Sequence, residues 1–129
     1  MEPMVNIALR AARKAGNLIA RASDDLTRLR FEAKGKADFV TEVDLASERE
    51  LIFNLQKTYP DQAFLCEESG RTGPENAACA WIIDPLDGTS NFMRGIPHYC
   101  ISIACTKAGK VEHAVVLDPV RQEEFTASR

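Results

Sequence analysis

The spacing of apolar residues changes once along this chain, near Pro60, from the spacing of helices to the short apolar runs of strands. This change limits the folds that the chain can adopt. Before that point, apolar residues recur at helical spacing over residues 4–22 and again over residues 44–58. Two helices followed by strands that are mostly linked as hairpins predict an α+β fold, with both helices on one face of a mostly antiparallel sheet. The strands are expected where short apolar runs occur, at residues 63–66, 80–83, 99–105, 111–117 and 124–127.

The composition is that of one packed domain. Of the 129 residues, 45% are hydrophobic and 27% are charged, which suits one core and is too little for two. The net charge of −3 argues against a dedicated nucleic-acid-binding protein. No apolar run reaches the ~18 residues of a membrane span, and no secretory signal is visible, so we expect a cytoplasmic protein with no membrane partner. The four cysteines lack CxxC spacing and are expected to be reduced thiols.

The first predicted helix carries basic residues between its apolar positions. They are Arg10, Arg13, Lys14 and Arg21. Such a set could bind a partner or RNA, although a solvated helix face is the more common explanation. Both alternatives stay open at the level of the sequence.

The connecting segments carry their own signals. Residues 28–33 and 38–43 look extended. Asp44 precedes an acidic first helical turn, so we expect it to be the N-cap of the second helix, with Leu45 on the apolar face of that helix. Residues 69–78 contain two Gly, a Pro and an Asn and predict a mobile loop.

Carboxylates and a phosphate-type turn follow one of the predicted strands. The strand ends at Asp84, and Asp87 comes three residues later, so both carboxylates can face one point. Gly88 and Thr89 then begin a short helical turn whose free N–H groups suit a phosphate. Hard oxygen ligands beside a phosphate cradle indicate a Mg²⁺ site for phosphoryl chemistry. On this motif alone, an Asp-Gly turn with Asp84 as a cap and no metal is an equal alternative.

A second acidic motif favours the metal. Glu67 directly follows the apolar run at residues 63–66. If the two strands are neighbours in the sheet, Glu67 lies near Asp84 and Asp87. Three carboxylates at adjacent strand ends repel one another unless a cation neutralises them. A divalent metal ion would resolve that repulsion.

Several motifs occur along the chain in a recognisable order. Residues 38–44 read Asp-Phe-Val-Thr-Glu-Val-Asp, residues 67–69 read Glu-Glu-Ser, and residues 84–92 read Asp-Pro-Leu-Asp-Gly-Thr-Ser-Asn-Phe. Together they resemble the three motifs of the inositol monophosphatase family. Residues 4–16 and 116–127 are similar to the bacterial SuhB type within it. The resemblance covers the whole chain and implies the fold of the N-terminal half of that family.

The resemblance implies Mg²⁺-dependent, lithium-sensitive hydrolysis of inositol-1-phosphate or a related small phosphate monoester. It assigns Glu67, Asp84 and the carbonyl of Leu86 to a first Mg²⁺. It assigns Asp84 and Asp87 to a second Mg²⁺, with Glu67 also helping to hold a third, loosely bound ion.

The resemblance also implies how water and phosphate are held. Thr89, with its hydroxyl linked to Asp44, would orient the attacking water beside Glu67, so these three are the expected catalytic residues. For Asp44, a purely structural role as a helix cap is an equal alternative. The expected substrate-binding residues are Glu67, Leu86, Asp87, Gly88 and Thr89.

Members of the family are much longer than this chain, and an Asp in their second half completes the second metal site. Residues 1–129 therefore resemble the N-terminal metal- and phosphate-binding half, without the C-terminal half. We expect little or no phosphatase activity from these residues alone, and a sheet face or edge without an obvious cover. For the full-length protein the resemblance implies a homodimer. The SuhB type also implies a function of another class, transcription antitermination through a Nus factor on RNA polymerase, which does not need phosphatase chemistry.

Overall fold

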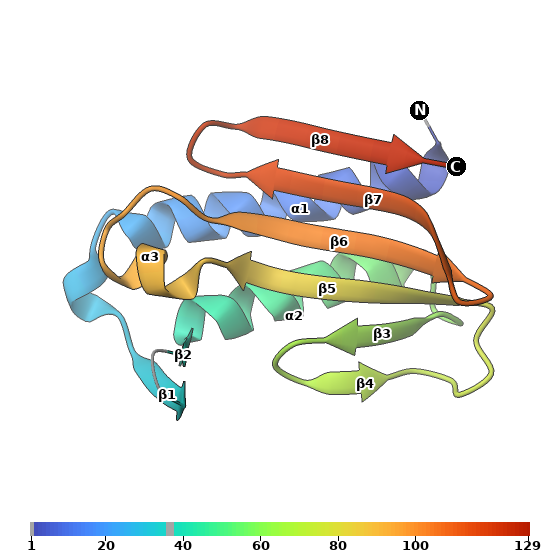
Figure 1. The fold of residues 1–129 in the computed structure, drawn as a ribbon, viewed down its shortest axis with the longest axis horizontal. Helices are drawn as coiled ribbons and strands as arrows, with labels where there is room; N and C mark the ends of the chain where they lie inside the picture. The colour runs from blue at the N-terminus through green and yellow to red at the C-terminus, as the bar shows by residue number, and fades with distance from the viewer. Residues whose placement is uncertain (1, 36–37) are drawn as a thin grey trace.

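The computed structural model describes residues 2–35 and 38–129, and in it two long helices cover one face of a six-stranded sheet (Figure 1). The helices are α1 (Pro3–Ser23) and α2 (Glu42–Thr58). The sheet contains β3 (Ala63–Cys66), β4 (Gly70–Thr72), β5 (Cys79–Asp87), β6 (Cys100–Lys107), β7 (Lys110–Asp118) and β8 (Glu123–Ser128). The shorter elements are η1 (Leu26–Arg28), β1 (Phe31–Gly35), β2 (Asp38–Thr41) and α3 (Thr89–Met93). The predicted α+β class is confirmed.

The helix α1 begins at a proline and buries one continuous stripe. Pro3 has no N–H to leave unpaired at the first helical position. Half of the stripe is alanine, whose small side chain lets α1 lie close to both α2 and β7. It comprises Val5, Ala8, Leu9, Ala11, Ala12, Ala15, Gly16 and Ile19. The predicted basic residues of this helix are all exposed, on the opposite side.

The start of α2 differs from the sequence-based expectation. Its N-cap is Thr41, whose hydroxyl accepts hydrogen bonds from the N–H groups of Val43 and Asp44. Asp44 is the third helical residue, and its carboxylate accepts the Thr41 N–H at 3.0 Å, which completes a capping box. Residues 38–43 are therefore extended only as far as Thr41, and Leu45 points to solvent. The predicted apolar face was wrong at Leu45 because polar residues of α2 occupy part of the buried side.

The sheet order is β4-β3-β5-β6-β7-β8. All pairs are antiparallel except β3 with β5, which run parallel and in register from Ala63 opposite Ala80 to Cys66 opposite Ile83. Both strands therefore point their C-terminal ends toward the same edge of the sheet. The predicted mobile loop at residues 69–78 contains the strand β4, because residues 70–72 pair back onto β3 as a hairpin.

The core lies between the two helices and the sheet. Its largest fully buried side chains include Trp81, Phe64, Phe92 and Ile101. All four cysteines are free thiols, as predicted, with Cys66 and Cys105 buried in this core. No helix within the described residues is long and apolar enough to cross a membrane.

The sheet face that points away from the helices carries exposed apolar side chains. Leu65, Ile82 and Phe125 are 47%, 43% and 56% exposed. Leu65 lies opposite Ile82 in the parallel pair, so the two form a continuous apolar surface. This agrees with the expectation of an uncovered sheet face.

For the isolated 129-residue chain, we expect this face to drive self-association, which Ile82→Lys should reduce because it places a charge at the centre of the patch. Light scattering against protein concentration measures the effect. Phe53→Lys is the matched control, since Phe53 is equally apolar and is exposed on α2, away from the sheet. Equal association by the two variants would contradict the role of the face.

Candidate active site

The parallel register of β3 and β5 brings two acidic residues together. Cys66 and Ile83 are partners, so the next residues, Glu67 and Asp84, lie side by side where β3 ends, while β5 continues to Asp87. The backbone N–H of Glu67 donates to the carbonyl of Ile83 at 3.3 Å, which continues the strand pairing into the turn. The predicted neighbourhood of Glu67 and Asp84 is therefore present, and it follows from the strand pairing.

Asp84 lies in surroundings that disfavour its negative charge. Burial, followed by a hydrogen bond with Glu67 and the negative charges of Glu67 and Asp87, raises the pKa of Asp84 to about 7. The N–H of Leu86 acts in the opposite direction. The oxygen Oδ1 of Asp84 is buried and accepts no hydrogen bond from the described residues. This carboxylate oxygen is buried, receives no hydrogen bond from the described part of the chain and lies beside a second carboxylate. Oxygen ligands of this kind suit a hard divalent cation.

Asp87 lies further out than predicted. A bulge interrupts the pairing of β5 with β6 between Asp84 and Asp87, and Asp87 is exposed, with its Oδ2 4.0 Å from the thiol of Cys100. Within residues 2–35 and 38–129, no three His, Cys, Asp or Glu side chains lie close enough together to hold a metal ion by themselves. The expected convergence thus holds for the pair Glu67 and Asp84, while Asp87 acts on Asp84 only through its charge.

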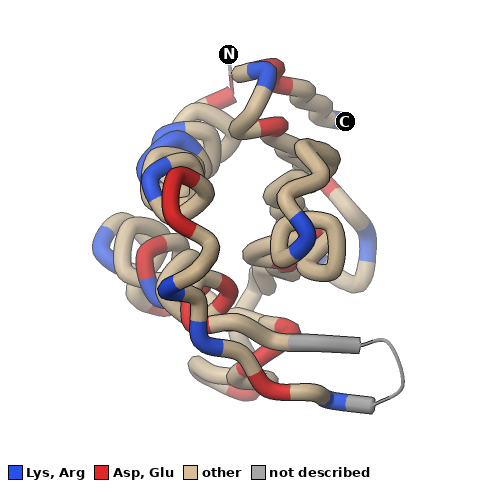
Figure 2. Tube along the Cα trace, turned by 90° about the vertical axis from the view of Figure 1, so that its left-hand side faces the viewer, with Lys and Arg blue, Asp and Glu red and all other residues tan. Residues whose placement is uncertain are grey.

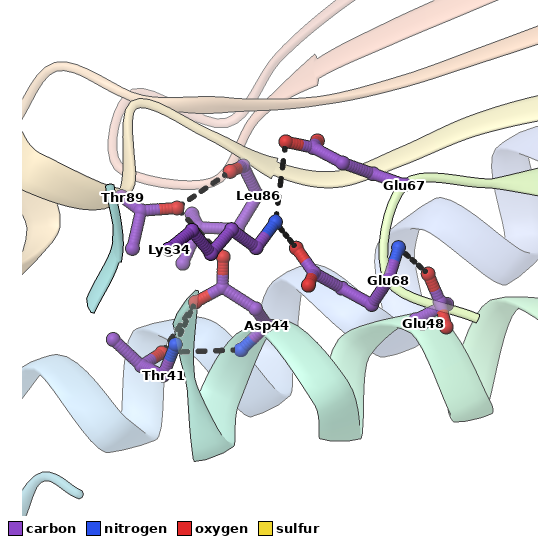
Figure 3. A network of polar contacts seen from close by, with 8 residues as sticks. All are labelled: Lys34, Thr41, Asp44, Glu48, Glu67, Glu68, Leu86 and Thr89. Atoms are coloured by element: carbon purple, nitrogen blue, oxygen red, sulfur yellow. Dashed lines mark hydrogen bonds and ion pairs between the residues drawn. The ribbon is translucent and has the colours of Figure 1, made fainter. Parts of the chain in front are cut away.

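Asp44 and Thr89 are linked directly although they are far apart in sequence (Figure 3). The Thr89 hydroxyl donates to Oδ1 of Asp44 at 2.6 Å, and the carbonyl of Leu86 lies 3.1 Å from the same hydroxyl. The other oxygen of Asp44 accepts from the N–H and the hydroxyl of Thr41. Asp44 therefore completes the capping box begun by Thr41 and also accepts the Thr89 hydroxyl, so a structural contact and a contact to Thr89 coexist on one side chain.

Gly88 occupies a position that only glycine fills without strain. It is the N-cap of α3 with φ of +102°, in the left-handed region. A Cβ at this position would lie 2.9 Å from the carbonyl oxygen of His98 and 3.1 Å from Cβ of Tyr99. The short helix that follows begins with N–H groups that have no acceptor within the helix. The predicted turn at Gly88 and Thr89 is present, and its N–H groups are available in principle to a phosphate.

Sequence reasoning missed the lysine side chain at this site. Lys34, on β1, places its Nζ 2.6 Å from Oε1 of Glu68 and 3.8 Å from Oε1 of Glu67 (Figure 3). Burial raises the pKa of Glu68, and the bond with Lys34 opposes that rise. Nothing in the sequence signals this contact, because it depends on how the β1–β2 hairpin packs against the turn after β3.

Two polar residues of α2 were missed as well. The hydroxyl of Ser47 donates to the carbonyl of Pro85 at 2.7 Å, and Oε1 of Glu48 accepts the N–H of Glu68 at 3.0 Å. A signal existed, since Ser47 and Glu48 stand three and four positions after Asp44 and thus share its helix face.

Comparison with known proteins was made against families, curated sequences and solved structures. Residues 1–129 match the model of the inositol monophosphatase family. The Nus factor SuhB of Pseudomonas aeruginosa is 55% identical over 131 residues, covering 100% of this chain and 48% of that protein. The chain thus spans about half the length of the curated relatives it matches.

Solved structures give the same result for the fold. The extragenic suppressor protein SuhB of Bartonella henselae has a TM-score of 0.96 at 38% identity, covering 99% of this chain and 50% of that one. An IMPase/NADP phosphatase complexed with Mg²⁺ and phosphate has a TM-score of 0.77 at 26% identity, covering 90% of this chain and 44% of that one. The arrangement of helices and strands described above is therefore that of a known phosphatase fold.

Proposed function

Since this chain belongs to the inositol monophosphatase family, we propose that it supplies the metal- and phosphate-binding half of a Mg²⁺-dependent phosphatase acting on inositol-1-phosphate or a related small phosphate monoester. The observation that carries the proposal is the buried, donor-free oxygen of Asp84 beside Glu67. Burying a carboxylate oxygen without a hydrogen bond costs free energy unless a cation or a proton binds to it.

Under this proposal, Glu67, Asp84 and the carbonyl of Leu86 hold one Mg²⁺, and Asp84 with Asp87 contributes to a second. The Thr89 hydroxyl is nearer to Asp44 than to Leu86, so the carbonyl of Leu86 keeps a lone pair for the cation. Bound Mg²⁺ would make a coordinated water more acidic and would offset negative charge on the phosphoryl oxygens.

The role of Thr89 in the proposal follows from its hydrogen bond. A hydroxyl has one hydrogen, and that of Thr89 is directed to Asp44. Its lone pairs are then left to accept a hydrogen bond from a water, which fixes the orientation of that water toward the phosphorus. The carboxylate of Asp44 strengthens the acceptor, because a donor bonded to an ionised group is polarised. The N–H groups of Gly88 and Thr89 would bind the phosphoryl oxygens.

Thr89→Val tests this role in the full-length protein. The substitution keeps the shape but removes the hydroxyl, and we expect phosphate release from inositol-1-phosphate to fall about 100-fold or more, because the group that orients the attacking water is lost. Thr89→Ser is the matched control, because it retains the hydroxyl and should retain most of the activity. Phosphate release is measured with Mg²⁺, with and without lithium. Full activity of the valine variant would refute the proposed role.

A second candidate function is binding to the transcription machinery, which the name of the SuhB relatives favours. A groove between α1 and α2 is lined by Arg10, Arg13, Lys14 and Lys57, and Figure 2 shows Lys and Arg positions along both helices. Arg13 is bonded to Glu124, at 2.5 and 2.9 Å, so its charge is partly compensated.

Pull-down of purified RNA polymerase and Nus factors by the full-length protein tests this second function. If the groove is the contact, charge reversal at Arg10 and Lys57 should weaken capture, while Thr89→Val should leave it unchanged. Capture that is equal in all variants would exclude the groove. The homodimer and the cytoplasmic location expected from the sequence remain predictions.

A further inference from the structure

The buried face of α2 carries polar side chains where a core helix normally carries apolar ones. Asp44, Ser47 and Glu48 are 2%, 0% and 4% exposed. They stand at positions i, i+3 and i+4, so they form one patch on the side of the helix that faces the sheet. Burying hydroxyl and carboxylate groups costs free energy unless each is matched by a hydrogen bond. Such a patch therefore needs an explanation beyond packing.

Each of these side chains holds a different segment of the candidate site. Asp44 accepts from Thr89 at the start of α3. Ser47 donates at 2.7 Å to the carbonyl of Pro85. Glu48 accepts the N–H of Glu68 at 3.0 Å. One rigid helix thus contacts all three segments that carry the proposed metal and water ligands.

The two contacts other than that of Asp44 lie immediately beside proposed ligands. Pro85 separates Asp84 from Leu86 in the bulged part of β5, and because proline has no N–H, its carbonyl is the polar backbone group that this residue offers. The Glu68 N–H is the first amide after Glu67. Holding these two backbone groups fixes the bulge of β5 and the turn after β3, from which the carboxylates of Asp84 and Glu67 project.

We propose that Ser47 and Glu48 are positioning residues, which hold the bulge of β5 at Pro85 and the turn at Glu67 so that Glu67, Asp84 and Leu86 face one cation. This inference rests on the proposed function. Apolar side chains at these two positions of α2 would pack equally well but could not hold the backbone groups. The polar side chains fix the metal ligands in advance, on a rigid helix. Neither residue touches the cation or the substrate itself.

The test compares metal affinity in variants of the full-length protein, with Mn²⁺ as the probe and titration followed by electron paramagnetic resonance. We expect Ser47→Ala and Glu48→Met to weaken Mn²⁺ binding about tenfold, the typical effect of losing a group that orients a metal ligand. Glu48→Gln keeps an oxygen that can accept the Glu68 N–H, and its affinity should stay close to that of the unchanged protein. Leu51→Ala is the control for stability, since Leu51 is fully buried on the same helix and makes no such contact.

The outcomes separate a positioning role from a structural one. Each affinity is measured where circular dichroism shows the variant folded, and Ser47→Ala, which removes a single oxygen, serves if Glu48→Met does not fold. Unchanged Mn²⁺ affinity in Ser47→Ala would overturn the inference, and so would an equal loss in Leu51→Ala. Absence of Mn²⁺ binding by the unchanged protein would instead overturn the proposed function, and with it this inference.

Discussion

Asp84→Asn in the full-length protein is expected to abolish Mg²⁺-dependent phosphate release, by on the order of a thousandfold or more, because several kcal/mol of charge stabilisation are lost with a metal ligand. Asp84 is the residue that both proposed metal ions share, and its buried Oδ1 has no donor among the described residues. The asparagine amide has the same shape but carries no charge. Retained activity would refute the assignment of Asp84 as a ligand.

Although Asp84→Asn should abolish activity, it should make the metal-free folded protein more stable at alkaline pH. The pKa of Asp84 is raised from 3.8 to about 7 in the folded state, so the folded protein binds this proton more tightly than the unfolded chain does. The contribution of the protonated Asp84 to the free energy of unfolding is complete below about pH 4 and is lost as the pH rises through about 7. With a chelator, the unchanged protein should therefore be less stable at pH 8 than at pH 5, by ~1 kcal/mol after allowance for solvent screening.

Urea unfolding at pH 5 and pH 8 with a chelator measures this effect. Asp84→Asn should remove most of the difference between the two pH values and should be the more stable form at pH 8. Asp61→Asn, at an exposed carboxylate outside the site, is the control and should leave the difference in place. A loss of stability in Asp84→Asn at pH 8 would mean that the Asp84 charge is stabilising without metal.

The isolated 129-residue chain is expected to release phosphate far more slowly than the full-length protein. Of the proposed ligands of the second metal ion it carries Asp84 and Asp87, and affinity for a hard cation falls when fewer charged ligands are present. A cavity beside Glu67 and Asp84 is also lined by Leu65, Ile82 and Ser102 on the uncovered sheet face, so water reaches the site and weakens every charge interaction there.

Phosphate release from inositol-1-phosphate by the two forms, at equal molar concentration, measures this difference. The proposed first metal site would use only residues of this chain, so weak Mg²⁺ binding should persist in the isolated form. Equal turnover by the two forms would show that the remaining part is dispensable for the chemistry. Absence of activity in both would shift weight to the proposed transcription role.

The agreement between sequence and structure is closest where local chemistry decides the outcome. Both helices were predictable from their spacing of apolar residues. The turn at Gly88 was predictable because Asp-Gly followed by hydroxyl residues is a local signal. The candidate ligands Glu67 and Asp84 were predictable one by one, since each directly follows an apolar run that forms a strand.

The errors arose where a residue's neighbours come from distant segments. Leu45 was expected inside and lies outside, because polar residues of α2 face the sheet to hold other segments. The sequence predicts a loop where β4 lies, because β4 pairs with β3 alone among the described strands, across a hairpin that its polar sequence does not indicate. Asp87 was expected to join the other two carboxylates, and a bulge in β5 turns it toward solvent and Cys100.

By itself the sequence determined which segments are helices and strands and which residues carry the acidic chemistry, since hydrophobic period and turn residues act over a few positions. Only the tertiary structure decided which acidic groups meet and what holds them. The parallel register of β3 with β5 brings Glu67 to Asp84, the packing of α2 brings Asp44 to Thr89, and the β1 strand brings Lys34 to Glu68. These contacts depend on the packing of elements that are distant in the chain, and no local pattern encodes that packing.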